Sequence, residues 1–187
     1  ETEWNKEELH SDYAITKYGA EMEVWRGHQE SLEVVIVNPG VIFGYGFPNQ
    51  GSDTIIQSVK KGQWFYTKGT ISIVSVNDVV KSMTVLMNSS ISGEKFIVVG
   101  ENLSIEHFLI FVATAFGVKR PSIYANKTLT AIAWRMDWLL ALLTGNKRKF
   151  TKILAQSAHD TTVVSNQKII ERIGFSFEKK EQYIIPE

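Results

Sequence analysis

The chain has 187 residues, 44% of them hydrophobic, which is enough to bury the core of one domain or slightly more and excludes an intrinsically disordered protein. Its 20 basic and 20 acidic side chains cancel, so no global field would attract nucleic acid or an anionic membrane. The sequence has no cysteine, which excludes a disulfide framework, a thiolate zinc site and a cysteine nucleophile.

The first expected element is a helix over residues 13–26. Ser11 is a residue type that caps helix amino termini, and Gly27 is typical of the position just past a carboxyl terminus. The next segment, 32–37, is short, β-branched and almost continuously apolar, as in a strand covered on both faces of a parallel sheet. The strand is expected to stop at residues 38–40. Because ligands of such sheets bind outside the carboxyl ends of the strands, this turn should border a crevice.

The remaining elements follow from hydrophobic patterns and capping residues. We expect an irregular loop at 43–52, helices at 54–61, 79–87, 105–116, 134–143 and 166–173, and strands at 71–76 and 96–99. Asn77 or Asp78 should cap the second of these helices. The residues of that helix that share one face are Val79, Met83, Leu86 and Met87.

The stretch 129–143 is the one segment apolar enough to be considered as a membrane span. It is shorter than the ~20 apolar residues that a span requires, and it contains Arg135 and Asp137. It is therefore expected to form a packed amphipathic helix.

Tyr13 and Lys17 are four residues apart in the first helix, so their side chains should lie on one face, one turn apart. A phenol is a weak acid at neutral pH, and a nearby ammonium stabilises its phenolate. A phenol assisted in this way can protonate a carbonyl oxygen while a hydride reaches the carbonyl carbon, because negative charge builds on that oxygen in the same step.

A tyrosine and a lysine at this spacing also occur by chance in many helices, so the pair by itself does not define a site. Here the segment YAITK at 13–17 is followed by Ala20 and Glu21 and then by VVIVNPGVIFG at 34–44. With these motifs the chain resembles the extended short-chain dehydrogenase/reductases, in particular their dihydroflavonol reductase-like branch. The resemblance covers nearly the whole chain, is most specific from 13 to 44 and is weaker beyond.

The resemblance implies a role for individual residues. Tyr13 would be the catalytic acid/base, and Lys17 would hold the nicotinamide ribose while assisting the phenol. The residues expected to pass close to the nicotinamide, at the end of the strand, are Asn38, Pro39, Gly40 and Val41. Gly40 suits this place because a residue without Cβ lets the backbone approach a ligand closely. The cofactor would be NAD or NADP, with NADP slightly favoured.

The resemblance also implies a small-molecule substrate, a cytoplasmic location and a homodimer formed through the helix that carries Tyr13, with contributions from Met22 and Trp25. No nucleic-acid or membrane partner is expected. The histidines are scattered without the spacing of metal ligands, so no metal site is expected. They are His10, His28, His107 and His159.

Two parts of the family's machinery are not found in these residues. The glycines follow no Gly-x-x-Gly-x-x-Gly spacing, so the phosphate-binding turn is missing from the sequence. The family's catalytic Ser or Thr lies upstream of the tyrosine helix, and Ser11 is better suited to cap that helix. We therefore expect that the amino-terminal Rossmann units lie outside this sequence and that the chain by itself is inactive.

The predicted fold is α/β, the carboxyl-terminal portion of a Rossmann-type doubly wound parallel sheet with a smaller mixed α/β substrate-binding lobe. Residues 1–42 would end the dinucleotide-binding domain, and 43–187 would form mainly the lobe, with 71–90 returning to the sheet. The predicted function is NAD(P)-dependent reduction of a carbonyl, or the reverse oxidation. A nucleotide-sugar epimerase or dehydratase shares the same pair and fold, and a non-catalytic dinucleotide sensor or interaction protein could keep the same scaffold.

Overall fold

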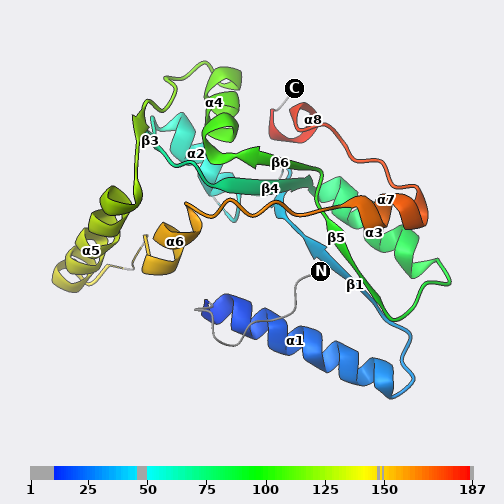
Figure 1. Cartoon of the computed structure of the whole chain (residues 1–187). Helices are drawn as coiled ribbons and strands as arrows, with labels where there is room; N and C mark the ends of the chain where they lie inside the picture. Colours follow the sequence, from blue (N-terminus) through cyan, green and yellow to red (C-terminus); the bar gives the residue numbers. More distant parts are fainter. Residues whose placement is uncertain (1–10, 46–49, 147, 149, 186–187) are drawn as a thin grey trace.

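The structure is a computed structural model that describes residues 11–45, 50–146, 148 and 150–185 (Figure 1). In this part of the chain the strands form three small sheets. These are β1 (Val35–Pro39) parallel to β5 (Glu94–Val98); β2 (Val41–Phe43) parallel to β4 (Thr70–Ser75), which runs antiparallel to β6 (Glu101–Ser104); and β3 (Phe65–Tyr66) parallel to β7 (Ile123–Tyr124). The helices are α1 (Asp12–Gln29), α2 (Asp53–Lys60), α3 (Val76–Met87), α4 (Ile105–Ala115), α5 (Lys127–Thr144), α6 (Lys152–Ser157), α7 (Gln167–Ile173) and α8 (Glu181–Ile184).

Parallel strand pairs joined through helices define the fold. The pair β2 and β4 is connected through α2, and β1 and β5 lie side by side although more than fifty residues separate them in the sequence. Helix α3 packs against β1, β2, β4 and β5, and α7 packs against β5. The predicted α/β Rossmann-like class is therefore confirmed.

Helix α1 begins where the sequence predicts and ends later. The Ser11 hydroxyl accepts a hydrogen bond from the backbone N–H of Ala14 at 3.0 Å, which satisfies one of the free donors of the first turn. The predicted end at Gly27 is wrong, because the helix continues to Gln29 and the chain turns at Ser31, whose φ is 77°. The Gly27 carbonyl accepts from the backbone N–H of Leu32 at 3.0 Å, which closes the turn around a residue other than glycine.

Strand β1 also ends later than predicted, and Asn38 and Pro39 are part of it. Both residues pair with β5, where Asn38 lies opposite Ile97 and Pro39 opposite Val98. The backbone N–H of Gly40 then donates to the Val98 carbonyl at 3.1 Å. The middle of β1 is only half-buried, so this strand lacks the complete cover that its apolar sequence predicts. Since β1 pairs with β5 alone in the described part of the chain, it can hold a proline without losing a ladder bond on its other side.

Strand β4 separates two hydrophobic cores. Side chains of adjacent strand residues point to opposite faces, so Ile73 faces one core and Val74 the other, and both are fully buried. The buried residues on the Ile73 side are Phe43, Ile56, Val59, Phe108, Leu109, Val112, Ala113, Tyr183 and Ile184. Those on the Val74 side are Val79, Leu86, Phe96, Val98, Ile169 and Phe175.

Helix α3 is capped by Ser75, not by Asn77 or Asp78 as predicted. The Ser75 hydroxyl accepts from the backbone N–H of Asn77 at 3.1 Å. The buried face of the helix carries Asp78 and Ser82 together with the expected valine and leucine, while Met83 and Met87 are exposed, which corrects the predicted inner face. The reason is tertiary: the Asp78 carboxylate turns inward to accept the backbone N–H of Glu178 at 2.9 Å.

Asp78→Asn is expected to remove a pH dependence of stability without lowering stability at neutral pH. Burial raises the pKa of Asp78, and the hydrogen bond from the Glu178 backbone lowers it in part. Because the folded state binds this proton more tightly than the unfolded state, the free energy of unfolding should decrease as pH rises above the ordinary value of about 3.9. Asparagine keeps an oxygen that can accept from Glu178 and carries no charge.

Urea unfolding of wild type and Asp78→Asn at a series of pH values between 4 and 8 measures this effect. The wild type should lose stability across the lower part of this range, and the variant should show a flatter profile. The assigned cause of the raised pKa would be contradicted if the free energy of unfolding changed equally with pH in the two proteins. It would also be contradicted if the variant were less stable than wild type by well above 1 kcal/mol at pH 7.

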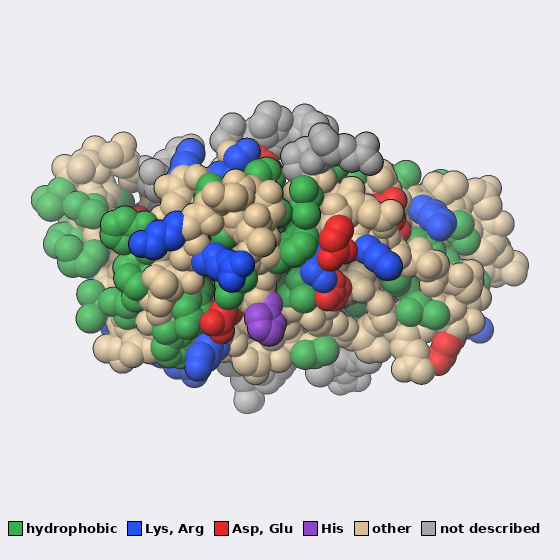
Figure 2. Space-filling view, turned by 90° about the horizontal axis from the view of Figure 1, so that it is seen from above, with side chains coloured by type: hydrophobic (Ala, Val, Ile, Leu, Met, Phe, Trp, Pro, Cys, Tyr) green, Lys and Arg blue, Asp and Glu red, His purple; other side chains and the backbone are tan. Residues whose placement is uncertain are grey.

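Helix α5 starts earlier than predicted, at Lys127, and ends at Thr144, one residue past the predicted end. Gly145, which has a φ of 69°, caps it. In α5 only Thr130 is buried, and its second half exposes large apolar side chains, including Leu142 at 68% and Leu143 at 73%. Figure 2 shows hydrophobic side chains gathered over the end of the molecule that α5 forms. None of the helices in the described part of the chain combines the length and apolar character that a membrane crossing requires.

Candidate active site

A single cleft is lined by all six residues that the sequence predicts as a site. It encloses about 1010 Å³ between the amino-terminal end of α1 and the junction of β1 and β2. The predicted residues among those lining it are Tyr13, Lys17, Asn38, Pro39, Gly40 and Val41. Their catalytic and cofactor-binding roles remain predictions, but the fold brings together residues that lie more than twenty positions apart in the sequence.

Tyr13 and Lys17 project from the first two turns of α1 toward this cleft. The Nζ atom of Lys17 lies 5.7 Å from the centroid of the Tyr13 ring, so the two side chains share one face of the helix, as their spacing predicts. The Tyr13 side chain is 72% exposed, so its phenol is open to a ligand in the cleft. Helix α1 as a whole buries no side chain, and an ion pair between Glu21 and Lys95 links it to β5 at 3.3 Å.

The other wall of the cleft is the backbone from β1 into β2. A Cβ atom at Gly40 would lie 2.5 Å from the Ser72 carbonyl oxygen and 3.1 Å from a methyl group of Val99. The need for glycine at this position therefore comes from close packing against β4 and the end of β5. The approach of a ligand to Gly40, which the sequence argument expects, stays a prediction beside this packing requirement.

Residues after β2 complete the cleft, and sequence reasoning missed them. Ser52, Asp53 and Thr54 at the start of α2 line the cleft. The Ser52 hydroxyl donates to the Ile42 carbonyl, which ties this segment to β2. The only available signal was the glycine-rich loop predicted at 43–52, of which residues 46–49 lie outside the described residues.

The lining of the cleft suits one end of a nicotinamide dinucleotide. It offers a phenol and an ammonium from α1 beside the apolar side chains of Pro39, Val41 and Ile42. Such a mixture of an apolar surface with a few convergent polar groups is typical of cofactor sites. The sequence has no glycine-rich phosphate-binding turn, so the fit covers the nicotinamide and its ribose and does not extend to the pyrophosphate.

The described histidines, His28, His107 and His159, are not among the residues that line this cleft. His28 uses Nδ1 to contact the Leu32 carbonyl at 2.9 Å, and His159 uses Nε2 to contact the Thr130 hydroxyl at 2.9 Å. His10 lies outside the described residues. Among the residues that the structure describes, no three His, Asp or Glu side chains are placed to share a metal ion.

The sequence matches a family of NAD-binding proteins described as "Male sterility protein" over residues 1–85, a segment that includes α1 and the whole β1–β2 wall. It is also similar to "Sterol demethylase protein B" of Methylococcus capsulatus, with 31% identity over 113 residues. The aligned segment covers 59% of this chain and 34% of that protein, so the chain spans about a third of the length of this curated relative.

Solved structures share the fold over nearly the whole chain. The crystal structure of gox2253 has a TM-score of 0.76 and 23% identity, covering 98% of this chain and 56% of that one. PA4631, a nucleoside-diphosphate-sugar epimerase from Pseudomonas aeruginosa, has a TM-score of 0.76 and 17% identity, covering 96% of this chain and 55% of that one. The chain thus spans just over half the length of these proteins. Residues 1–85 thus match a family of NAD-binding proteins, and the chain as a whole shares the fold of these solved structures.

Proposed function

We propose that this chain supplies the acid/base pair and the nicotinamide side of the active site of an NAD(P)-dependent oxidoreductase. The reaction is reduction of a carbonyl on a small organic substrate, or the reverse oxidation of the alcohol. The observation that carries the proposal is the meeting of Tyr13 and Lys17 with the 38–41 segment in one cleft. NAD and NADP both remain candidates, because the residue that meets the adenosine ribose is not assigned.

Each group of residues in the cleft has its own role in this proposed reaction. The bound nicotinamide would supply the hydride that attacks the carbonyl carbon. The Tyr13 hydroxyl donates its proton to the carbonyl oxygen as negative charge develops there, and it takes the proton back in the reverse reaction. The Lys17 ammonium stabilises the resulting phenolate and holds the cofactor ribose. Pro39 and Val41, which line the same cleft, would offer an apolar surface to the nicotinamide ring.

The proposal includes membership of the extended short-chain dehydrogenase/reductases. The assignment as a reductase within this group rests on the segment Asn38-Pro39-Gly40, which resembles that of the dihydroflavonol reductase-like branch. A nucleotide-sugar epimerase or dehydratase is the alternative, since a structure titled as such an epimerase shares the fold. The two differ in outcome: a reductase consumes one reduced nicotinamide per product, whereas an epimerase leaves the cofactor unchanged over a full cycle. A non-catalytic dinucleotide sensor would bind cofactor without turnover.

The test uses the protein at its full natural length, with the 187-residue chain as a comparison. NADPH or NADH is added with a panel of aldehydes and ketones, and the absorbance of the reduced nicotinamide is followed. The panel includes a steroid ketone because the 31% identical relative is named for sterol demethylation. We expect oxidation of cofactor that depends on a carbonyl substrate. Cofactor binding without turnover across a broad panel would overturn the proposal and favour the sensor.

The homodimer is also a proposal, supported by the surface of α1. This helix buries no side chain within the chain, and Met22 is 38% exposed. Trp25 is half-buried and donates from Nε1 to Glu21 at 3.2 Å. Light scattering on the full-length protein should give twice the monomer mass, and Met22→Asp should lower the measured mass toward that of the monomer. A monomeric wild type would contradict the proposal.

A further inference from the structure

A second cavity lies beneath α5 and shares no lining residue with the Tyr13 cleft. It encloses about 380 Å³, within the range of small-molecule sites, and most of its lining is apolar. Leu109 and Ala125 are almost fully buried, whereas Phe65 and Leu129 are 46% and 39% exposed and lie toward the solvent. The wall comes from β3, α4, the end of β7, α5 and the segment around α6, so distant parts of the sequence create this space together.

Two of the polar side chains around this cavity, Gln63 and Thr130, already have partners inside the protein. The Gln63 amide nitrogen donates to the Phe65 carbonyl at 3.0 Å, and its oxygen accepts from the Ser58 hydroxyl at 2.7 Å. The Thr130 hydroxyl contacts the Asn126 carbonyl at 3.3 Å and the His159 ring at 2.9 Å. With these groups satisfied, the cavity offers little to a charged or strongly polar ligand.

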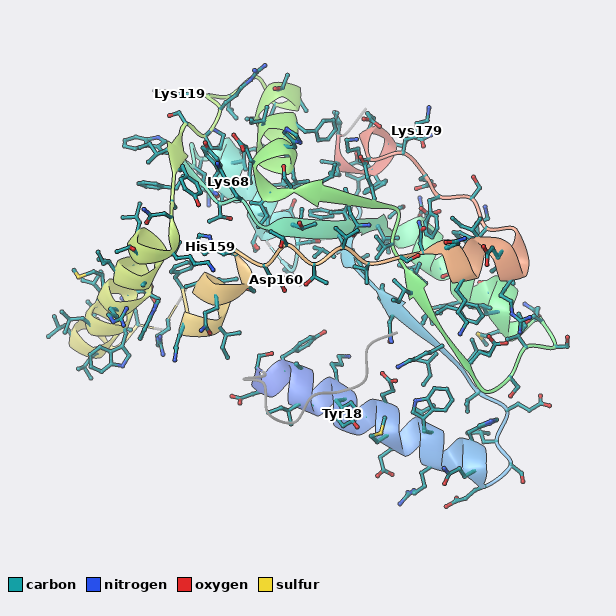
Figure 3. The ribbon with its side chains drawn as sticks, viewed as in Figure 1. Tyr18, Lys68, Lys119, His159, Asp160 and Lys179 are labelled. Carbon is teal, nitrogen blue, oxygen red and sulfur yellow. The ribbon has the colours of Figure 1, made fainter. Side chains whose placement is uncertain are left out.

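His159 fixes one side of this arrangement. Figure 3 labels it near α6, and its bond to Thr130 joins the end of α6 to the first turns of α5. Burial first and the nearby Lys127 charge second lower the pKa of His159, so the ring is neutral at neutral pH and adds no charge beside the cavity. This hydrogen bond ties the start of α5 to the segment after α6. The cavity lies on the side of α5 that faces α4.

Small side chains keep this space open. Ala125, Ala133 and Ala158 all line it, although the rest of α5 is rich in large residues such as Trp134 and Leu139. Filling a cavity with a larger apolar side chain that fits usually increases stability, so packing by itself gives no reason for three alanines here. Space that remains open and apolar suits the binding of an apolar group.

We propose that this cavity beneath α5 binds the uncharged hydrocarbon part of a ligand, such as an aliphatic chain or a fused alicyclic ring system. The ligand enters at the Phe65 and Leu129 side and covers Leu109 and Ala125 at the base. The affinity comes from apolar area removed from water. The proposal does not depend on hydride transfer, because the Tyr13 cleft uses other residues.

The test titrates the 187-residue chain with N-phenyl-1-naphthylamine, an uncharged aromatic probe whose fluorescence rises in an apolar site, and then adds decanol as a competitor. We expect saturable binding that decanol displaces. Ala133→Phe fills the cavity and should weaken probe binding at least tenfold. Ala141→Phe is the matched control, because it adds the same ring to the same helix at a residue outside the cavity lining, and its binding should stay within twofold of wild type.

Three results would overturn the proposal: no saturable probe binding, wild-type binding by Ala133→Phe, or an equal loss in Ala133→Phe and Ala141→Phe. If Ala133→Phe does not fold, Ala158→Leu replaces it on the opposite wall. Tyr13→Phe should bind the probe like wild type. A protein that binds the probe in this cavity but reduces no carbonyl would remove the proposed oxidoreductase activity and leave this site standing.

Discussion

Tyr13→Phe is expected to lower kcat for carbonyl reduction by about 10²–10⁴-fold, the range for removal of a positioned acid/base. The variant keeps the aromatic ring beside Lys17 and loses only the hydroxyl that donates the proton. Because the ring still lines the cleft, KM for the cofactor should change little. Steady-state kinetics on the full-length protein measures both constants.

Tyr18→Phe provides the control for this substitution. Tyr18 lies on the same helix, is labelled in Figure 3 and is not among the residues that line the cleft, so loss of its hydroxyl should leave kcat within about twofold of wild type. Lys17→Met should lower kcat and also raise KM for the cofactor, since Lys17 is proposed to act on both. Equal activity of Tyr13→Phe and wild type would exclude Tyr13 as the acid.

Gly40→Ala is expected to lower the free energy of unfolding by about 1–3 kcal/mol, the usual range for an atom forced into a packed site. The new Cβ would lie 2.5 Å from the Ser72 carbonyl oxygen. That neighbour is backbone in the middle of β4 and cannot rotate away as a flexible side chain would, so the junction of β1 and β2 must move away from β4. The same shift would displace the wall of the Tyr13 cleft.

Gly19→Ala is the matched control. Gly19 lies within α1, and a Cβ there would meet no atom within 4 Å. Alanine favours the helix over glycine by about 0.5–1 kcal/mol, so this variant should be as stable as wild type or slightly more stable. Urea unfolding followed by circular dichroism gives both values. If Gly40→Ala proves as stable as Gly19→Ala, the claim that Gly40 packs closely against β4 is contradicted.

Local signals predicted two helix ends well, the start of α1 and the end of α5. Ser11 caps α1 by a bond three residues along the chain, and Gly145 ends α5 in the left-handed conformation, so each signal and its effect lie within one turn. The ends of β1 and the cap of α3 were predicted less well. Asn38 and Pro39 belong to β1 because β5 pairs with them, and Asp78 turns inward because Glu178 donates to it from the far end of the chain. Such partners cannot be read from neighbouring residues.

The same distinction applies to the site. The pair Tyr13 and Lys17 is fixed by helical geometry, so its common face followed directly from the spacing. The contribution of Ser52 and Thr54 depends on how the chain returns after β2, and no local pattern marks it. The sequence argument did not foresee the packing of Gly40 against Ser72, because this contact crosses between strands.

The most direct test of the proposed activity is transfer of deuterium from reduced nicotinamide that carries deuterium at both positions of C4. The full-length protein is incubated with the labelled cofactor and a carbonyl substrate, and the product is analysed by mass spectrometry. Hydride transfer beside Tyr13 predicts an alcohol that carries one deuterium on the former carbonyl carbon, formed by wild type and much more slowly by Tyr13→Phe. An unlabelled product, or a labelled one formed equally fast by Tyr13→Phe, would contradict the assignment.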